Sequence, residues 1–131
     1  MIVLDTHVLV WWVSGAARLT ARARRALAAA VRRGPVVASA ISIFEIATAV
    51  RRGRLELGVP LDQWFADLLV LPELRIEPVS AAIAQIAGQF PDPLPGDPAD
   101  RLIAATARLL KARLITADER LRKSPHIAVV W

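Results

Sequence analysis

The chain has 131 residues, the size of one ordinary domain with a single buried core, so we expect one domain over residues 1–131. It has no cysteine, which excludes disulfides and thiolate metal sites, and its 17 Lys and Arg residues against 12 Asp and Glu residues give a net charge of +5. Hydrophobic residues make up 55% of the chain, but charged residues interrupt every apolar stretch well before the ~20 residues of a membrane span, so we expect a cytoplasmic protein.

Short apolar runs alternate with helical patterns along the chain. The runs are typical of strands buried on both faces, and they cover residues 2–4, 36–38, 75–77, 114–116 and 127–130. Between them the spacing of apolar residues, with caps and Gly or Pro stops, predicts helices over residues 8–13, 19–33, 43–53, 60–71, 80–89 and 99–112. This alternation predicts βαβ units and therefore an α/β three-layer sandwich, with a central parallel β-sheet flanked by helices.

Four acidic residues lie where predicted strands give way to helices, and these are Asp5, Glu45, Asp100 and Asp118. If the strands are parallel, all four carboxylates gather at the edge of the sheet where ligands bind in open α/β folds. Clustered carboxylates raise one another's pKa unless a cation offsets their charge. Because oxygen-only ligation favours a hard cation, the cluster predicts a site for Mg²⁺ or Mn²⁺, which would activate a water as the nucleophile.

Helix capping is the alternative explanation for the same positions. Asp97 before Pro98 is typical of a helix N-cap, and Asp100 would then lie in the first turn, where the helix dipole stabilises negative charge. Two Ser/Thr-x-x-Glu patterns, Ser42 to Glu45 and Thr116 to Glu119, match capping boxes. In a parallel sheet the cap positions and the cleft positions coincide, so capping explains each acid singly but does not require their accumulation at one crevice.

Four segments together resemble the PIN domain, and more narrowly the VapC-type toxins of bacterial toxin–antitoxin pairs. In family order they are MIVLDTHVLVW (residues 1–11), SAISIFEIATAVRRGRL (39–55), DPADRLIAATA (97–107) and LITAD (114–118). The resemblance implies Asp5, Glu45 and Asp100 as the core metal-binding triad, with Asp118 as the fourth acidic position. It further implies Mg²⁺- or Mn²⁺-dependent endoribonuclease activity, a homodimer, and inhibition by a small antitoxin whose C-terminal segment lies across the active-site groove.

Polar neighbours of the acids are candidates for a supporting role. The hydroxyls of Thr6 and Thr116 could orient a carboxylate or a metal-bound water, with ordinary capping as the equally weighted alternative. Asp97 belongs to the same supporting set. His7, two residues after Asp5, is expected to be structural and to point away from the cleft.

Arg51, Arg52 and Arg54 close the helix predicted over residues 43–53. They would bind RNA phosphates if they reach the acidic groove, although basic residues in a last helical turn also complement the helix dipole. The aromatic residues Trp11, Trp12, Trp64 and Phe65 are expected to anchor the core or an interface rather than to stack on bases. Two rival functions remain open, namely a non-catalytic RNA- or protein-binding module and a PIN-like nuclease that acts on DNA.

Overall fold

The computed structural model describes residues 1–15, 17–91, 94 and 96–131, and within them five strands form one sheet in the order β3-β2-β1-β4-β5. Every neighbouring pair of strands runs parallel, as predicted. The strand positions agree with the apolar runs to within one or two residues, except that the last strand is shorter. They are β1 (Ile2–Leu4), β2 (Val36–Ser39), β3 (Leu74–Glu77), β4 (Arg113–Ile115) and β5 (Val129–Val130).

Seven helices connect these strands in the described part of the chain, and six of them were predicted. Their bounds are α1 (Thr6–Val13), α2 (Ala21–Arg33), α3 (Ala40–Arg51), α4 (Leu61–Leu69), α5 (Ala81–Gln89), α6 (Pro98–Leu109) and α7 (Glu119–Arg122). Helix α7 was not predicted, because four residues are too few to show a helical period. None of the helices described is long and apolar enough to cross a membrane.

Both predicted capping boxes are wrong. Ser39 caps α3, and its Oγ accepts a hydrogen bond from the Ile41 amide at 3.1 Å, so the helix begins earlier than the sequence suggested. Ser42 therefore lies inside the helix and is free to interact with another element. In the same way Asp118, not Thr116, is the N-cap of α7.

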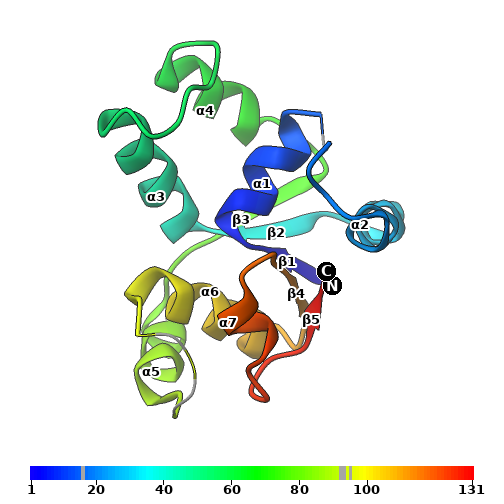
Figure 1. The fold of residues 1–131 in the computed structure, drawn as a ribbon, viewed down its shortest axis with the longest axis vertical. Helices are drawn as coiled ribbons and strands as arrows, with labels where there is room; N and C mark the ends of the chain where they lie inside the picture. Colours follow the sequence, from blue (N-terminus) through cyan, green and yellow to red (C-terminus); the bar gives the residue numbers. More distant parts are fainter. Residues whose placement is uncertain (16, 92–93, 95) are drawn as a thin grey trace.

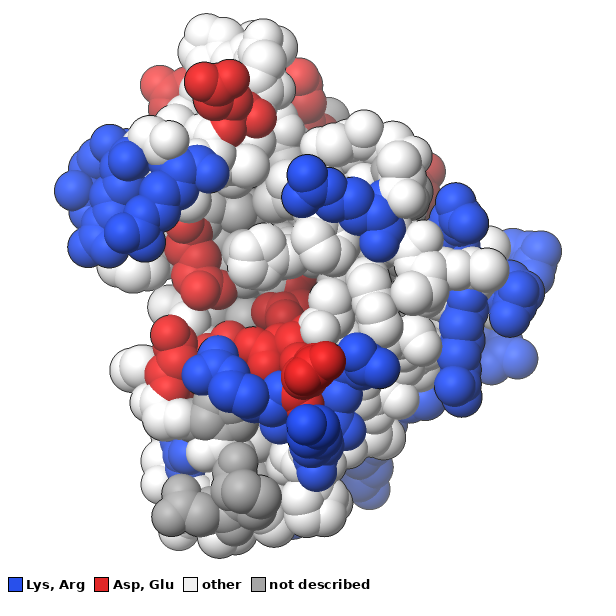
Figure 2. All heavy atoms as spheres, viewed as in Figure 1, with Lys and Arg blue, Asp and Glu red and all other residues white. Residues whose placement is uncertain are grey.

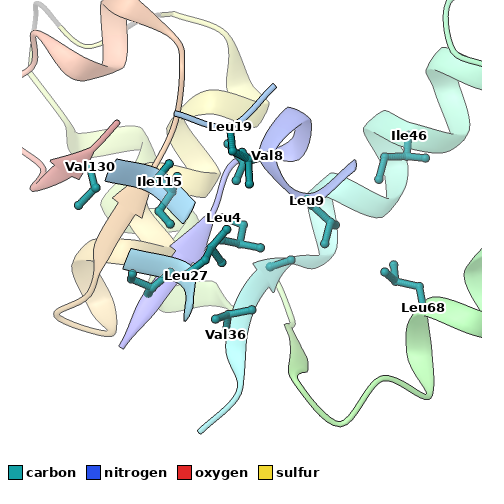
Figure 3. Close-up of a cluster of buried hydrophobic side chains, with 13 residues drawn as sticks. Leu4, Val8, Leu9, Leu19, Leu27, Val36, Ile46, Leu68, Ile115 and Val130 are labelled. Atoms are coloured by element: carbon teal, nitrogen blue, oxygen red, sulfur yellow. The ribbon is translucent and has the colours of Figure 1, made fainter. Parts of the chain in front are cut away.

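Two hydrophobic clusters lie on the two faces of the sheet, because successive strand side chains alternate between faces. Ile2 and Leu4 of β1 join the cluster beneath α1 to α4, which Figure 3 shows in close-up, whereas Val3 joins the cluster beneath α5 to α7. Figure 1 shows the two groups of helices on opposite sides of the strands. The predicted three-layer sandwich is therefore confirmed.

Parallel pairing places the chain at the end of β1 beside the chain at the end of β4. Leu4 is paired with Ile115, and the Asp5 amide donates to the Ile115 carbonyl at 3.0 Å, so the pairing extends one step beyond the strand. Asp5 and Thr116 consequently lie next to each other at the carboxyl edge of the sheet. This is the edge at which ligands bind in open α/β folds.

Candidate active site

A cleft of about 560 Å³ lies at the carboxyl edge of the sheet and collects carboxylates from four separate segments. Figure 2 shows the acidic side chains gathered in a hollow between the α3 side of the molecule and the side formed by α6 and α7. The structure brings together all four predicted acids and also two predicted supporting residues, Thr6 and Asp97. The lining carboxylates are Asp5, Glu45, Asp97, Asp100 and Asp118.

Asp5 lies at the floor of this cleft with 6% of its surface exposed. Its Oδ1 accepts a hydrogen bond from the Thr6 amide at 2.8 Å and caps α1, while its Oδ2 accepts from the Thr116 hydroxyl at 2.6 Å. Burial raises the pKa of Asp5 above its ordinary value, although both hydrogen bonds act in the opposite direction. Both carboxylate oxygens are therefore held in fixed positions.

Thr6 links Asp5 to Glu45 across two helices. Its hydroxyl donates to Glu45 Oε1 at 2.5 Å and lies 2.8 Å from the Ser42 hydroxyl. Since a threonine hydroxyl carries one proton, Ser42 must donate to Thr6 when Thr6 donates to Glu45. Burial raises the pKa of Glu45, and the Thr6 hydrogen bond partly opposes this. Ser42 is thus a supporting residue that sequence analysis mistook for a cap.

Asp100 is a further carboxylate of the cleft whose pKa is raised, and it lies in the first turn of α6. Asp97 caps α6 through hydrogen bonds from the Ala99 and Asp100 amides at 2.8 and 3.2 Å, which confirms the predicted N-cap. Burial, followed by the charges of Asp5 and of the other acids in the cleft, raises the pKa of Asp100 from 3.8 to about 7. The charges of the other carboxylates therefore act on the pKa of Asp100 in the direction predicted, in addition to the larger effect of burial.

Asp118 departs from that prediction because of Arg120, a residue that sequence analysis did not single out. Asp118 caps α7 by accepting from the Arg120 amide at 2.8 Å and the Leu121 amide at 3.4 Å. The Arg120 guanidinium lies 3.2 Å from Asp118 Oδ2 and 3.5 Å from Asp100 Oδ2. Burial alone would raise the pKa of Asp118, but the hydrogen bonds from Arg120 outweigh it and hold that pKa below its ordinary value. Its position inside the undetected α7 is why Arg120 was missed.

The remaining cleft lining is partly aromatic and basic. His7, Trp11 and Arg18 line the cleft together with Arg54, so the expectation that His7 points away is wrong. Arg51 and Arg52 line an adjoining hollow that also includes Arg54, and Figure 2 shows a basic cluster next to the acidic hollow. Of the three predicted phosphate-binding arginines, only Arg54 therefore borders both hollows.

The carboxylates of the cleft offer oxygen donors, the donor type that a hard divalent cation prefers. Although the carboxylates line one cleft, no group of three or more Asp, Glu or His side chains in the described residues is arranged to hold a metal ion directly. Mg²⁺ characteristically keeps several waters and takes only one or two carboxylates, so an open arrangement of oxygen donors suits it. The Arg120 guanidinium lies close to both Asp100 and Asp118, so this part of the cleft favours positive charge.

Comparison with known proteins defines the class. A PIN domain family model matches residues 2–126, and the chain belongs to this family. The chain is 36% identical to Ribonuclease VapC22 of Mycobacterium tuberculosis over 99% of its own length and 98% of that protein's length, which confirms the narrower resemblance to VapC-type proteins.

Solved structures share the fold over almost the whole chain. VapBC2 from Rickettsia felis, bound to a promoter DNA fragment, superposes with a TM-score of 0.70 at 20% identity and covers 98% of this chain and 97% of that one. FitAcB from Neisseria gonorrhoeae superposes with a TM-score of 0.68 at 25% identity and covers 98% of this chain and 96% of that one. The PIN-like architecture inferred from the four motifs is thereby confirmed.

Proposed function

We propose that the chain is a metal-dependent endoribonuclease and the toxin of a toxin–antitoxin pair, with residues 1–131 acting as a single PIN domain. The observation that carries the proposal is the convergence of Asp5, Glu45, Asp100 and Asp118 from separate segments on one cleft. The 36% identical relative is named a ribonuclease, which supports RNA rather than DNA as the substrate.

Oxygens of Asp5, Glu45, Asp100 and Asp118 would hold Mg²⁺ or Mn²⁺, directly or through bound water. The ion when bound lowers the pKa of a coordinated water and neutralises charge that develops on the scissile phosphate. The protein's own contribution is to fix the donors. Thr116 and Thr6 hold the two oxygens of Asp5, and Thr6 in turn holds Glu45. The Asp97 cap orients the first turn of α6, from which Asp100 enters the cleft.

Arginines beside the cleft would supply the attraction for RNA that the acidic floor lacks. Arg54 borders the cleft itself, while Arg51 and Arg52 border the hollow next to it. A phosphate backbone that crosses from one hollow to the other would meet all three guanidinium groups. Neutralising phosphates in this way makes binding salt-dependent, which gives a direct test.

A protein partner is proposed on two grounds. The structural relatives include FitAcB and a toxin-antitoxin complex from Klebsiella pneumoniae, so this chain is proposed to bind a cognate antitoxin. The surface also carries exposed apolar side chains, including Phe44, Leu69 and Val70 with 66%, 63% and 77% of their surfaces accessible. Such groups are typical of interfaces, and we infer that they are covered in a homodimer or by the antitoxin.

The deciding experiment measures RNA cleavage by two kinds of variant. One kind removes a proposed metal ligand, and the other keeps the N-cap of helix α6. Asp5→Asn, Glu45→Gln and Asp100→Asn should each abolish most cleavage of a single-stranded RNA while the far-ultraviolet circular dichroism stays unchanged. Asp97→Asn should be mild, since Asn caps a helix about as well as Asp. Full cleavage by Asp100→Asn, or loss of cleavage in Asp97→Asn alone, would refute the assignment of ligands.

Metal and substrate are tested with the same assay. Cleavage should stop in EDTA and return with Mn²⁺, and a DNA oligonucleotide of the same sequence should remain intact. Turnover that survives rigorous chelation would contradict metal dependence. Cleavage of the DNA instead of the RNA would favour the rival nuclease, and binding without any cleavage would favour the non-catalytic module.

A further inference from the structure

One wall of the cleft, next to the carboxylates, is built from two rings and a guanidinium. The Trp11 ring lies with its centroid 5.8 Å from that of His7, and the Arg18 Cζ lies 5.9 Å from the Trp11 centroid. All three residues line the cleft that holds the acids. We refer to His7, Trp11 and Arg18 as the stacked wall.

The helix start at Asp5 explains why this wall lies beside the acids. Asp5 caps α1, so His7 falls in the first turn, and Trp11 follows one turn later on the same side of the helix. Trp11 is half-buried, contacts Trp131 at a centroid distance of 6.0 Å and packs against the core, whereas His7 and Arg18 are exposed. A fixed indole thus supports two solvent-facing groups at the edge of the cleft.

An exposed ring next to a guanidinium matches the chemistry of single-stranded nucleic acid. Bases of any sequence stack on aromatic rings, and the planar fork of arginine binds phosphate oxygens. Because the wall is continuous with the acidic cleft, a strand whose phosphate reaches the carboxylates would pass over it. Arg18 also supplies positive charge to the same cleft.

We propose that the stacked wall holds a single-stranded segment of the RNA substrate beside the reacting phosphate. The His7 ring stacks on a base, Arg18 binds a backbone phosphate, and Trp11 is a positioning residue that keeps both in place. This proposal rests on the proposed ribonuclease function and adds to it the strand type and the residues that grip it. It also assigns to Trp11 a role beyond the core or interface anchoring expected from the sequence.

The test measures affinity separately from chemistry. A fluorescently labelled ten-nucleotide single-stranded RNA is titrated in EDTA with the Asp100→Asn protein, which leaves the RNA intact, and with the same protein carrying His7→Ala or Arg18→Gln. His7→Ala removes one stacked base and should weaken RNA binding roughly 5- to 100-fold. Arg18→Gln removes one phosphate contact and should reduce by about 0.7 the slope of log Kd plotted against log salt concentration. In the active protein with Mn²⁺, both substitutions should raise KM and leave kcat within about twofold.

Two matched controls identify the cause. Arg24→Gln removes the same charge from an exposed arginine that borders a different hollow, and it should leave Kd and KM unchanged. His7→Phe keeps an aromatic ring and should retain the parent affinity for RNA. If His7 acted only through its charge, this substitution would weaken RNA binding. Unchanged RNA affinity in both His7→Ala and Arg18→Gln, with normal cleavage by the parent, would overturn the stacked wall and leave the ribonuclease function standing. Absence of RNA cleavage by the parent would overturn both.

Discussion

Replacing Asp100 by Asn should stabilise the metal-free protein at alkaline pH, although the same substitution removes a proposed ligand. Burial and the surrounding carboxylates raise the pKa of Asp100 from 3.8 to about 7. The folded protein therefore holds a proton that the unfolded chain has released between pH ~4 and ~7, so stability falls as pH rises through this window. Above pH ~7 the ionised carboxylate is fully destabilising, and an uncharged Asn relieves the repulsion.

The magnitude follows from the same pKa. A rise from 3.8 to about 7 would correspond, without screening, to about 4 kcal/mol. Water and salt in the open cleft screen the repulsion, so we take about 1 to 2 kcal/mol. Loss of a favourable first-turn charge costs about 0.3 to 1 kcal/mol in the other direction. The net gain of about 1 kcal/mol should raise Tm by roughly 3 to 5 °C for a chain of this size.

Thermal melts of parent and variant in EDTA at pH 5 and pH 8 provide the assay. The Tm gain of Asp100→Asn should be larger at pH 8 than at pH 5, where the folded parent still holds the proton although the unfolded chain has begun to release it. Asp62→Asn is the matched control, because Asp62 is an exposed first-turn acid of α4 outside the cleft and should lose stability slightly at pH 8. A variant that melts no higher than the parent at pH 8, or whose gain is equal at both pH values, would refute the reasoning.

Three further substitutions test individual contacts. Thr116→Val removes a hydroxyl that donates to buried Asp5 and should lower the free energy of urea unfolding at neutral pH by about 1 to 3 kcal/mol. Arg120→Gln removes the positive charge between two carboxylates. Calorimetry should therefore show tighter Mn²⁺ binding, and thermal melts in EDTA should show a lower Tm. Weaker Mn²⁺ binding would contradict this expectation. Arg54→Gln should flatten the salt slope of RNA binding by about 0.7, whereas Arg33→Gln, at the opposite edge of the sheet, should not change it.

The sequence was sufficient for the architecture because the strands are apolar on both faces and the helices are separated by Gly, Pro or caps. Ile2 to Leu4, for example, is fully buried, as a central parallel strand must be. Errors arose where the local signal was ambiguous. Ser39 and Ser42 are both able to cap a helix, and only the tertiary contact of Ser42 with Thr6 distinguishes them. Helix α7 was missed because it is a single turn.

The gathering of the four acids at one cleft was predicted correctly, whereas the cationic neighbour Arg120 was not anticipated. Topology alone gathers Asp5, Asp100 and Asp118 at one edge, so their positions followed from the strand and helix pattern. The approach of Arg120 to Asp100 depends on the path of the chain after β4, which carries no periodic signal. For the same reason the pKa of Asp118 was expected to rise, whereas the structure holds it down.

The hydrogen bonds also separate the capping explanation from the ligand explanation. Asp97 and Asp118 each use one carboxylate oxygen to accept from two backbone amides, so each of them caps a helix. Within the described residues the Asp100 carboxylate accepts from Arg120 and from no backbone amide, and its surroundings raise its pKa to about 7. A carboxylate that caps nothing and whose surroundings raise its pKa is what the proposed cation site predicts at this position. Asp100 is therefore the position at which the two explanations make opposite predictions, and the melts described above choose between them.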